Sequence, residues 1–140
     1  MKKLLLPFFA VFLLAGCVTS TVKPTVEYKP MSKFTEKGDM VVADIEGTNY
    51  TSYLFGIFPI VGGSWGRPNA WQYNMWQSTV SERKTRFMMN WYATKVMKAD
   101  GIENLKITRD TIGWPTLWIV SWRTVNASAQ VIKKRPAAAK

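Results

Sequence analysis

The sequence contains no histidine, and its single cysteine lies at position 17. Histidine is the commonest general base and the commonest metal ligand in proteins, so its absence argues against Ser–His catalysis and against zinc, copper and haem sites. A single cysteine also excludes an internal disulfide. We therefore expect no catalytic residue, no metal and no dissociable cofactor, and we expect that the chain is not an enzyme.

The sequence also lacks an apolar run long enough to cross a bilayer. Lys2 and Lys3 precede an uncharged segment, residues 4–15, of about a dozen apolar residues. A transmembrane helix needs about 20 such residues. A short positive start, a short apolar stretch and small residues at its end predict a secretory signal peptide.

The end of this segment, Leu14-Ala15-Gly16-Cys17, resembles the lipobox of bacterial lipoproteins. This resemblance implies cleavage between Gly16 and Cys17, a diacylglycerol on the Cys17 sulfur and an acyl group on its new amine. Several acyl chains anchor a protein firmly, whereas one chain binds only marginally. The covalent lipid would be the only group attached to the chain. A plain secretory signal with a chance cysteine, or an uncleaved anchor, would be the alternatives.

The residue after the cysteine bears on the expected location. In lipoproteins of Gram-negative bacteria an Asp at this position favours retention in the inner membrane, and here the residue is Val18. The resemblance therefore implies a protein anchored in the cell envelope, on the periplasmic face of the outer membrane if the host is Gram-negative.

Acidic residues are scarce, with 9 Asp and Glu against 19 Lys and Arg, which gives a formal net charge of +10. In an exported protein this charge argues for anionic lipids or envelope polymers as partners, and against nucleic acid. A charged, solvated surface without any partner is the simpler interpretation.

The composition predicts four regions. These are a signal peptide over 1–16, a lipidated Cys17 with a flexible tether over 17–38, a folded domain over 39–132 and a basic disordered tail over 133–140. Thr, Ser, Lys and Pro dominate the tether, which would span about 25 Å as a flexible chain.

Hydrophobic periodicity predicts strands over 39–46, 50–60, 103–110 and 116–132, with a turn at 47–49 and a loop at 61–69. A helix is expected over 79–99, capped by Thr79 and Glu82, although its apolar stripe extends back to Tyr73 and Trp76. The order β-β-α-β-β predicts a small two-layer α+β domain with an antiparallel sheet of about four strands and one main helix on one face. In this pattern the body is loosely similar to small bacterial lipoproteins of uncharacterised function, which implies no activity.

Two patterns could in principle carry chemistry. Residues 62–66 match the G-x-S-x-G nucleophile elbow, but that motif requires a histidine partner, so a glycine-rich turn is the better interpretation. Asp44 and Glu46 share one face of a strand, and an enzyme acting on cell-wall bonds would need them to converge with Glu103 in a cleft. Solvated carboxylates are the simpler alternative.

The aromatic residues offer the stronger hypothesis. The apolar segment 54–66 and the loop residues beside it could contact a membrane or a protein partner through Phe55, Phe58, Trp65 and Trp114. A buried strand with a packed turn is the alternative. We expect a non-catalytic, lipid-anchored binding or structural module, or more narrowly an accessory subunit that docks on a larger envelope complex through this segment.

Overall fold

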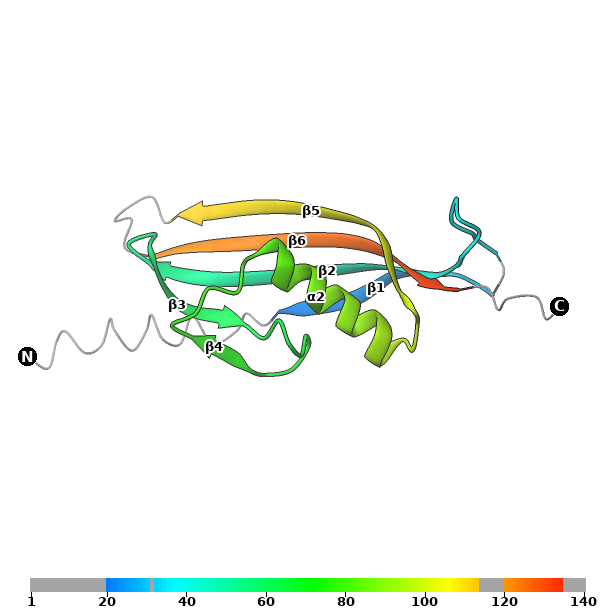
Figure 1. Cartoon of the computed structure of the whole chain (residues 1–140). Coiled ribbons are helices and arrows are strands. Elements are labelled where there is room, and N and C mark those ends of the chain that lie inside the picture. Colours follow the sequence, from blue (N-terminus) through cyan, green and yellow to red (C-terminus); the bar gives the residue numbers. More distant parts are fainter. Residues whose placement is uncertain (1–19, 31, 114–119, 135–140) are drawn as a thin grey trace, which may run out of the picture.

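The computed structural model describes residues 20–30, 32–113 and 120–134. An antiparallel sheet in the order β4-β3-β2-β6-β5, with β1 also paired to β2, carries one helical segment on one face (Figure 1). The elements are β1 (Thr21–Glu27), β2 (Met40–Leu54), β3 (Phe58–Gly63), β4 (Tyr73–Met75), α2 (Glu82–Trp91), the π-helical turn η2 (Tyr92–Val96), β5 (Gly101–Gly113) and β6 (Val120–Lys133). The predicted α+β class is confirmed, but six strands replace the expected four.

The centre of the sheet is the long pairing of β2 with β6, from Met40 opposite Lys133 to Leu54 opposite Val120. The turn predicted at 47–49 is wrong, because β2 continues through it. Gly47 faces the Met88 and Met89 side chains, which leave no room for a Cβ atom. This glycine therefore lets the helix approach the sheet closely, and its conformational freedom is not used for a turn.

The strand predicted over 50–60 is instead a hairpin. β2 ends at Leu54, and β3 returns from Phe58 to Gly63, into the region predicted to be a loop. The helix does not extend back to Tyr73 and Trp76, because Tyr73–Met75 form the edge strand β4. The second error arises because a short run with aromatic residues fits either a helix or a strand by periodicity alone.

The helix begins at Glu82, and its N-cap is Ser81, whose side chain accepts a hydrogen bond from the Lys84 N–H. Thr79, the predicted cap, is fully buried. Its hydroxyl lies 2.8 Å from the Thr51 hydroxyl and 2.8 Å from the Tyr50 carbonyl oxygen. The helix ends at Val96, three residues before the predicted end.

The predicted tether is wrong for β1, which pairs with β2 from Thr21 opposite Thr48 to Glu27 opposite Ala43. Val22 is the one buried residue of this strand, and the others are exposed, so the composition of the segment resembles that of a linker. At the other end β6 extends to Lys133, and the Lys134 N–H bonds the Asp100 carboxylate at 2.8 Å, inside the predicted tail.

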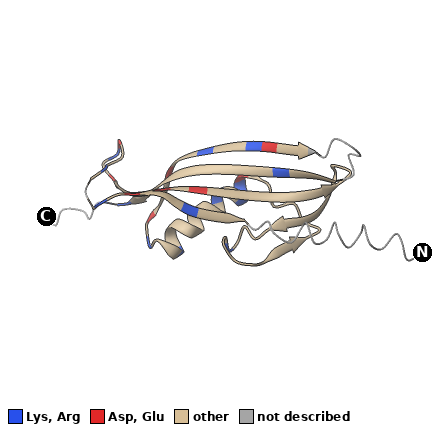
Figure 2. Cartoon of the chain, turned by 180° about the vertical axis from the view of Figure 1, so that it is seen from behind, with Lys and Arg blue, Asp and Glu red and all other residues tan. Residues whose placement is uncertain are grey.

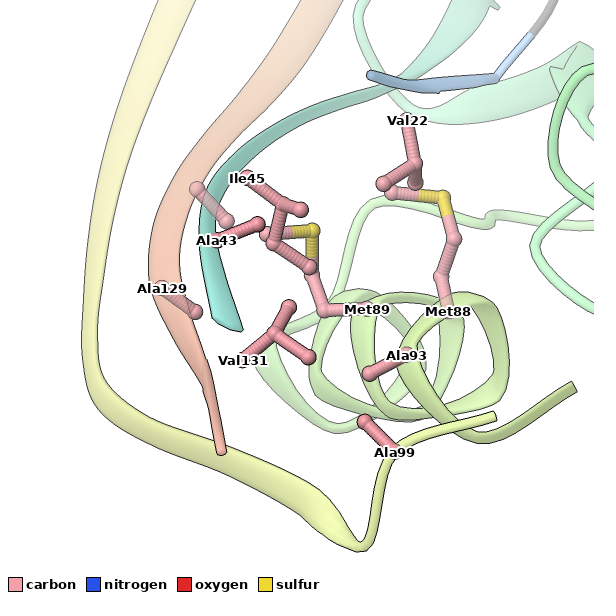
Figure 3. Packing of buried hydrophobic residues seen from close by; sticks show 10 residues of the cluster. Val22, Ala43, Ile45, Met88, Met89, Ala93, Ala99, Ala129 and Val131 are labelled. Carbon is pink, nitrogen blue, oxygen red and sulfur yellow. The ribbon is translucent and has the colours of Figure 1, made fainter. Parts of the chain in front are cut away.

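The core lies between α2 and the sheet (Figure 3). Small residues of β2 and β6 face Met88 and Met89 from the helix, and Leu105 and Ile107 of β5 pack against this cluster. The buried residues of the cluster are Val22, Ala43, Ile45, Met88, Met89, Ala93, Ala99, Ala127, Ala129 and Val131. Seen from behind, the strands lie in front of α2, and neither α2 nor η2 covers this face of the sheet; positions of Lys, Arg, Asp and Glu are spread along the strands (Figure 2).

Candidate functional site

The hairpin between β2 and β3 turns through a backbone conformation that its first residue does not favour. Phe55 and Gly56 have φ angles of 51° and 69°, and the Ile57 N–H donates to the Leu54 carbonyl at 3.1 Å. Two central residues with positive φ are typical of a type I′ turn, which favours Asn-Gly or Gly-Gly. Phenylalanine in this left-handed region costs about 1–2 kcal/mol.

The side chains at this turn are exposed. Phe55, Ile57 and Phe58 expose 59%, 72% and 60% of their surface. Trp76, just after β4, exposes 70% and also has a positive φ of 56°. Its N–H donates to the Ile60 carbonyl at 3.0 Å, which places it two residues along β3 from Phe58. We call Phe55, Ile57, Phe58 and Trp76 the apolar tip.

Polar contacts on the sheet hold the tip in place. Arg123 on β6 donates to the Gly56 carbonyl at 2.9 Å, and its guanidinium lies 4.5 Å from the centroid of the Tyr53 ring. The Tyr53 hydroxyl in turn lies 2.6 Å from the Ser78 hydroxyl. The turn is therefore fixed before any partner arrives, which lowers the entropic cost of binding.

The residues predicted to contact a membrane or a partner do not lie at one place in the structure. Phe55 and Phe58 lie together at the tip, whereas Trp65 is only partly exposed and packs edge-on against Phe87, with ring centroids 5.3 Å apart. The Lys84 ammonium lies 5.6 Å from the Trp65 ring centroid. Trp114 lies outside the described residues.

The predicted cleavage and lipidation residues, Gly16 and Cys17, also lie outside the described residues. Ile57 and Trp76 were not predicted as members of the apolar tip. Ile57 lay inside a predicted strand, and Trp76 matched the apolar stripe of the helix. The short polar stretch 77–79 interrupts the helical pattern, and it could have indicated that Trp76 lies outside the helix.

Of the three carboxylates considered for catalysis, Asp44 and Glu103 are each paired with a different lysine, and Asp44 lines the same surface depression as Glu46. Asp44 Oδ2 accepts a 2.6 Å hydrogen bond from the Tyr28 hydroxyl and lies 3.7 Å from Lys33 Nζ. The hydrogen bond with Tyr28, more than the charge of Asp44, raises the pKa of Lys33. Glu103 Oε1 pairs with Lys37 at 3.2 Å.

Glu46 lines a shallow surface depression beside Lys106 and Ser128. In the G-x-S-x-G stretch, Ser64 is buried, and Gly62 faces Thr79 with no room for a Cβ atom. Gly62 therefore has a packing role, whereas a Cβ atom on Gly66 would meet no neighbouring atom within 4 Å. The Tyr50 hydroxyl is buried, and burial, followed by the charge of Tyr73, raises the pKa of Tyr50 to about 12.

Among residues 20–30, 32–113 and 120–134, no three acidic or cysteine side chains cluster as metal ligands would. Within the same ranges, no helix has the length and apolarity to cross a membrane.

The comparisons with known proteins leave the site to be interpreted from its own chemistry. No family model, no curated protein and no solved structure matches this chain.

Proposed function

We propose that the chain is a lipid-anchored envelope protein that acts as a non-catalytic binding module and docks on an envelope protein through the apolar tip. The observation that carries the docking role is Phe55, a bulky aromatic residue in a left-handed turn with most of its surface exposed. Its backbone strain destabilises the fold, and its exposed ring contributes little burial in return.

Backbone strain of this kind clusters at functional sites of proteins. Trp76 combines the same two properties, a positive φ and 70% exposure, and adjoins the same hairpin. Aromatic side chains of this type dominate the binding energy of protein interfaces. The coincidence of two strained, exposed aromatic residues at one end of the sheet supports a shared docking role.

The lipid anchor is proposed from the Leu14-Ala15-Gly16-Cys17 motif, and Val18 supports the outer membrane as its location. Phe55 lies six residues beyond Asn49 along β2, or about 20 Å. Asn49 accepts a hydrogen bond from Ser20, near the point where the anchor would join the domain. The tip would therefore lie about 20 Å along the sheet from the anchored end of β1, where an envelope protein could contact it.

Two experiments test the proposal. Cys17→Ala should release the protein from the membrane fraction, and its retention there without any lipid label on the unmodified protein would contradict the anchor. A photo-crosslinking residue at Ile57 in living cells should give a discrete protein adduct. The same probe at Thr108, which is exposed on β5, is the matched control. Equal adducts from both positions, or none from Ile57, would contradict docking through the tip.

A further inference from the structure

We propose that the loop between β3 and β4, residues 64–72, rests on the anionic headgroups of the bilayer that holds the anchor. We call this segment the anchor-side loop. The inference rests on the proposed lipidation of Cys17 and adds to it an orientation and a second membrane contact.

The lipid on Cys17 would lie close to the folded body. Ser20 is fully buried, and its hydroxyl donates to Asn49 Oδ1 at 2.7 Å, so the folded body already includes this residue. Cys17 precedes it by only three residues, a length of chain that reaches at most about 10 Å. An acylated Cys17 would therefore hold Ser20 close to the headgroups, well short of the 25 Å expected from a long tether.

Ser20 is hydrogen-bonded to the anchor-side loop. The Asn69 N–H donates to the Ser20 carbonyl at 2.9 Å. Its side-chain amide bonds both backbone groups of Val22, accepting from the N–H at 2.9 Å and donating to the carbonyl at 2.7 Å. The anchor-side loop is thus clamped to the start of β1, which Figure 1 shows beside it. Whatever holds Ser20 near a membrane also holds this loop there.

The anchor-side loop exposes one aromatic and one cationic side chain. Trp71 exposes 80% of its surface, the largest value among the exposed large apolar residues of the described chain. Arg67 is exposed as well, and no described carboxylate forms an ion pair with it. Tryptophan is enriched at the level of lipid headgroups, and basic residues are attracted to an anionic membrane surface. An anionic lipid surface therefore suits this loop.

A site-directed spin label can test the contact in the lipidated protein. Because the lipid would occupy the only native thiol, Gln72→Cys would introduce a single free thiol and leave Trp71 intact. The labelled protein is reconstituted into vesicles of phosphatidylethanolamine and phosphatidylglycerol. Accessibility of the label to oxygen and to a water-soluble nickel complex then reports its depth. Thr108→Cys and Ile57→Cys, both at exposed positions, are the matched controls.

We expect the label at position 72 to be several-fold less accessible to the nickel complex than the labels at 108 and 57. Arg67→Glu should raise its accessibility toward that of the controls. A label at 72 as accessible as the one at 108, in vesicles that retain the protein, would overturn the membrane contact and leave the lipid anchor standing. Failure of the protein to float with the vesicles would overturn the anchor itself, and with it this inference.

Discussion

Phe55 and Asn69 both have a positive φ angle, but only the Asn69 side chain makes hydrogen bonds that stabilise the fold. Their φ angles are 51° and 66°, both in the left-handed region that most side chains avoid. Asparagine tolerates this region, because its short polar side chain can bond locally, whereas phenylalanine gains nothing there. The positive φ angle is therefore expected at Asn69 and unexpected at Phe55.

Asn69 uses its conformation to bind β1. Its main chain and side chain together make three hydrogen bonds to Ser20 and Val22. Phe55 points an exposed ring into solvent, and the polar contact at its turn is made by the neighbouring Gly56 carbonyl. A residue that suits its backbone conformation needs no further explanation, whereas one that does not points to a role outside the fold.

The same contrast recurs at a second pair of positions. Asn104 has a φ of 53°, and its amide donates to Gln130 Oε1 at 2.6 Å across the β5–β6 bulge. Trp76 has a φ of 56° and exposes 70% of its surface. Asn69 and Asn104 both stabilise the local structure, whereas Phe55 and Trp76 both belong to the apolar tip.

The largest expected effect is at Asn69. Asn69→Ala removes two side-chain hydrogen bonds and leaves a Cβ-bearing residue in a left-handed conformation, so we expect a loss of about 3 kcal/mol in the free energy of unfolding. Urea unfolding measures this loss. Asn69→Gly is the matched control, because it keeps the backbone conformation without strain and should cost only about 1–2 kcal/mol. An alanine variant as stable as the glycine variant would show that the strain at this position is negligible.

Phe55→Asn should have the opposite sign. The substitution places a favoured residue in the type I′ turn and removes a side chain that is mostly exposed, so we expect the free energy of unfolding to rise by about 1 kcal/mol. Phe58→Asn is the matched control, since its exposure of 60% is nearly that of Phe55 and its φ is not positive. Urea midpoints compare the two.

The two variants also separate strain from binding. Both should weaken the crosslink from Ile57, because each removes an aromatic ring of the apolar tip, but only Phe55→Asn should stabilise the protein. If Phe55→Asn destabilised the protein, the ring would have a structural contact, and the argument for docking based on strain would fail.

Much of the sheet could be predicted from the sequence, because alternation of Val41, Ala43 and Ile45 marks a strand with one buried face. Strand β1 could not be predicted in this way, because it buries only Val22 and its sequence shows no apolar alternation. The role of Gly47 could not be predicted either, because it depends on contact with Met88 and Met89, some forty residues away in the sequence.

The candidate site was predicted in part for a similar reason. Phe55 and Phe58 were predicted because they are large aromatic residues in the apolar segment 54–66. Trp65 was identified on the same ground, yet its ring packs against Phe87. Composition indicates that an aromatic residue lies near a turn, but only the tertiary structure distinguishes a ring packed on the helix from one left in solvent.

The smallest expected effect is at Trp76, and it gives the finest test of the contrast. Trp76→Asn should stabilise the protein by about 0.5 kcal/mol, less than Phe55→Asn, because the short edge strand β4 lets its backbone relax. Trp71→Asn is the matched control, with a larger exposure and no positive φ, and it should leave the urea midpoint unchanged. Equal shifts for the two variants would mean that the gain comes from removing exposed apolar surface. A gain confined to Trp76 and Phe55 would mean that left-handed strain is what the apolar tip maintains at the expense of stability.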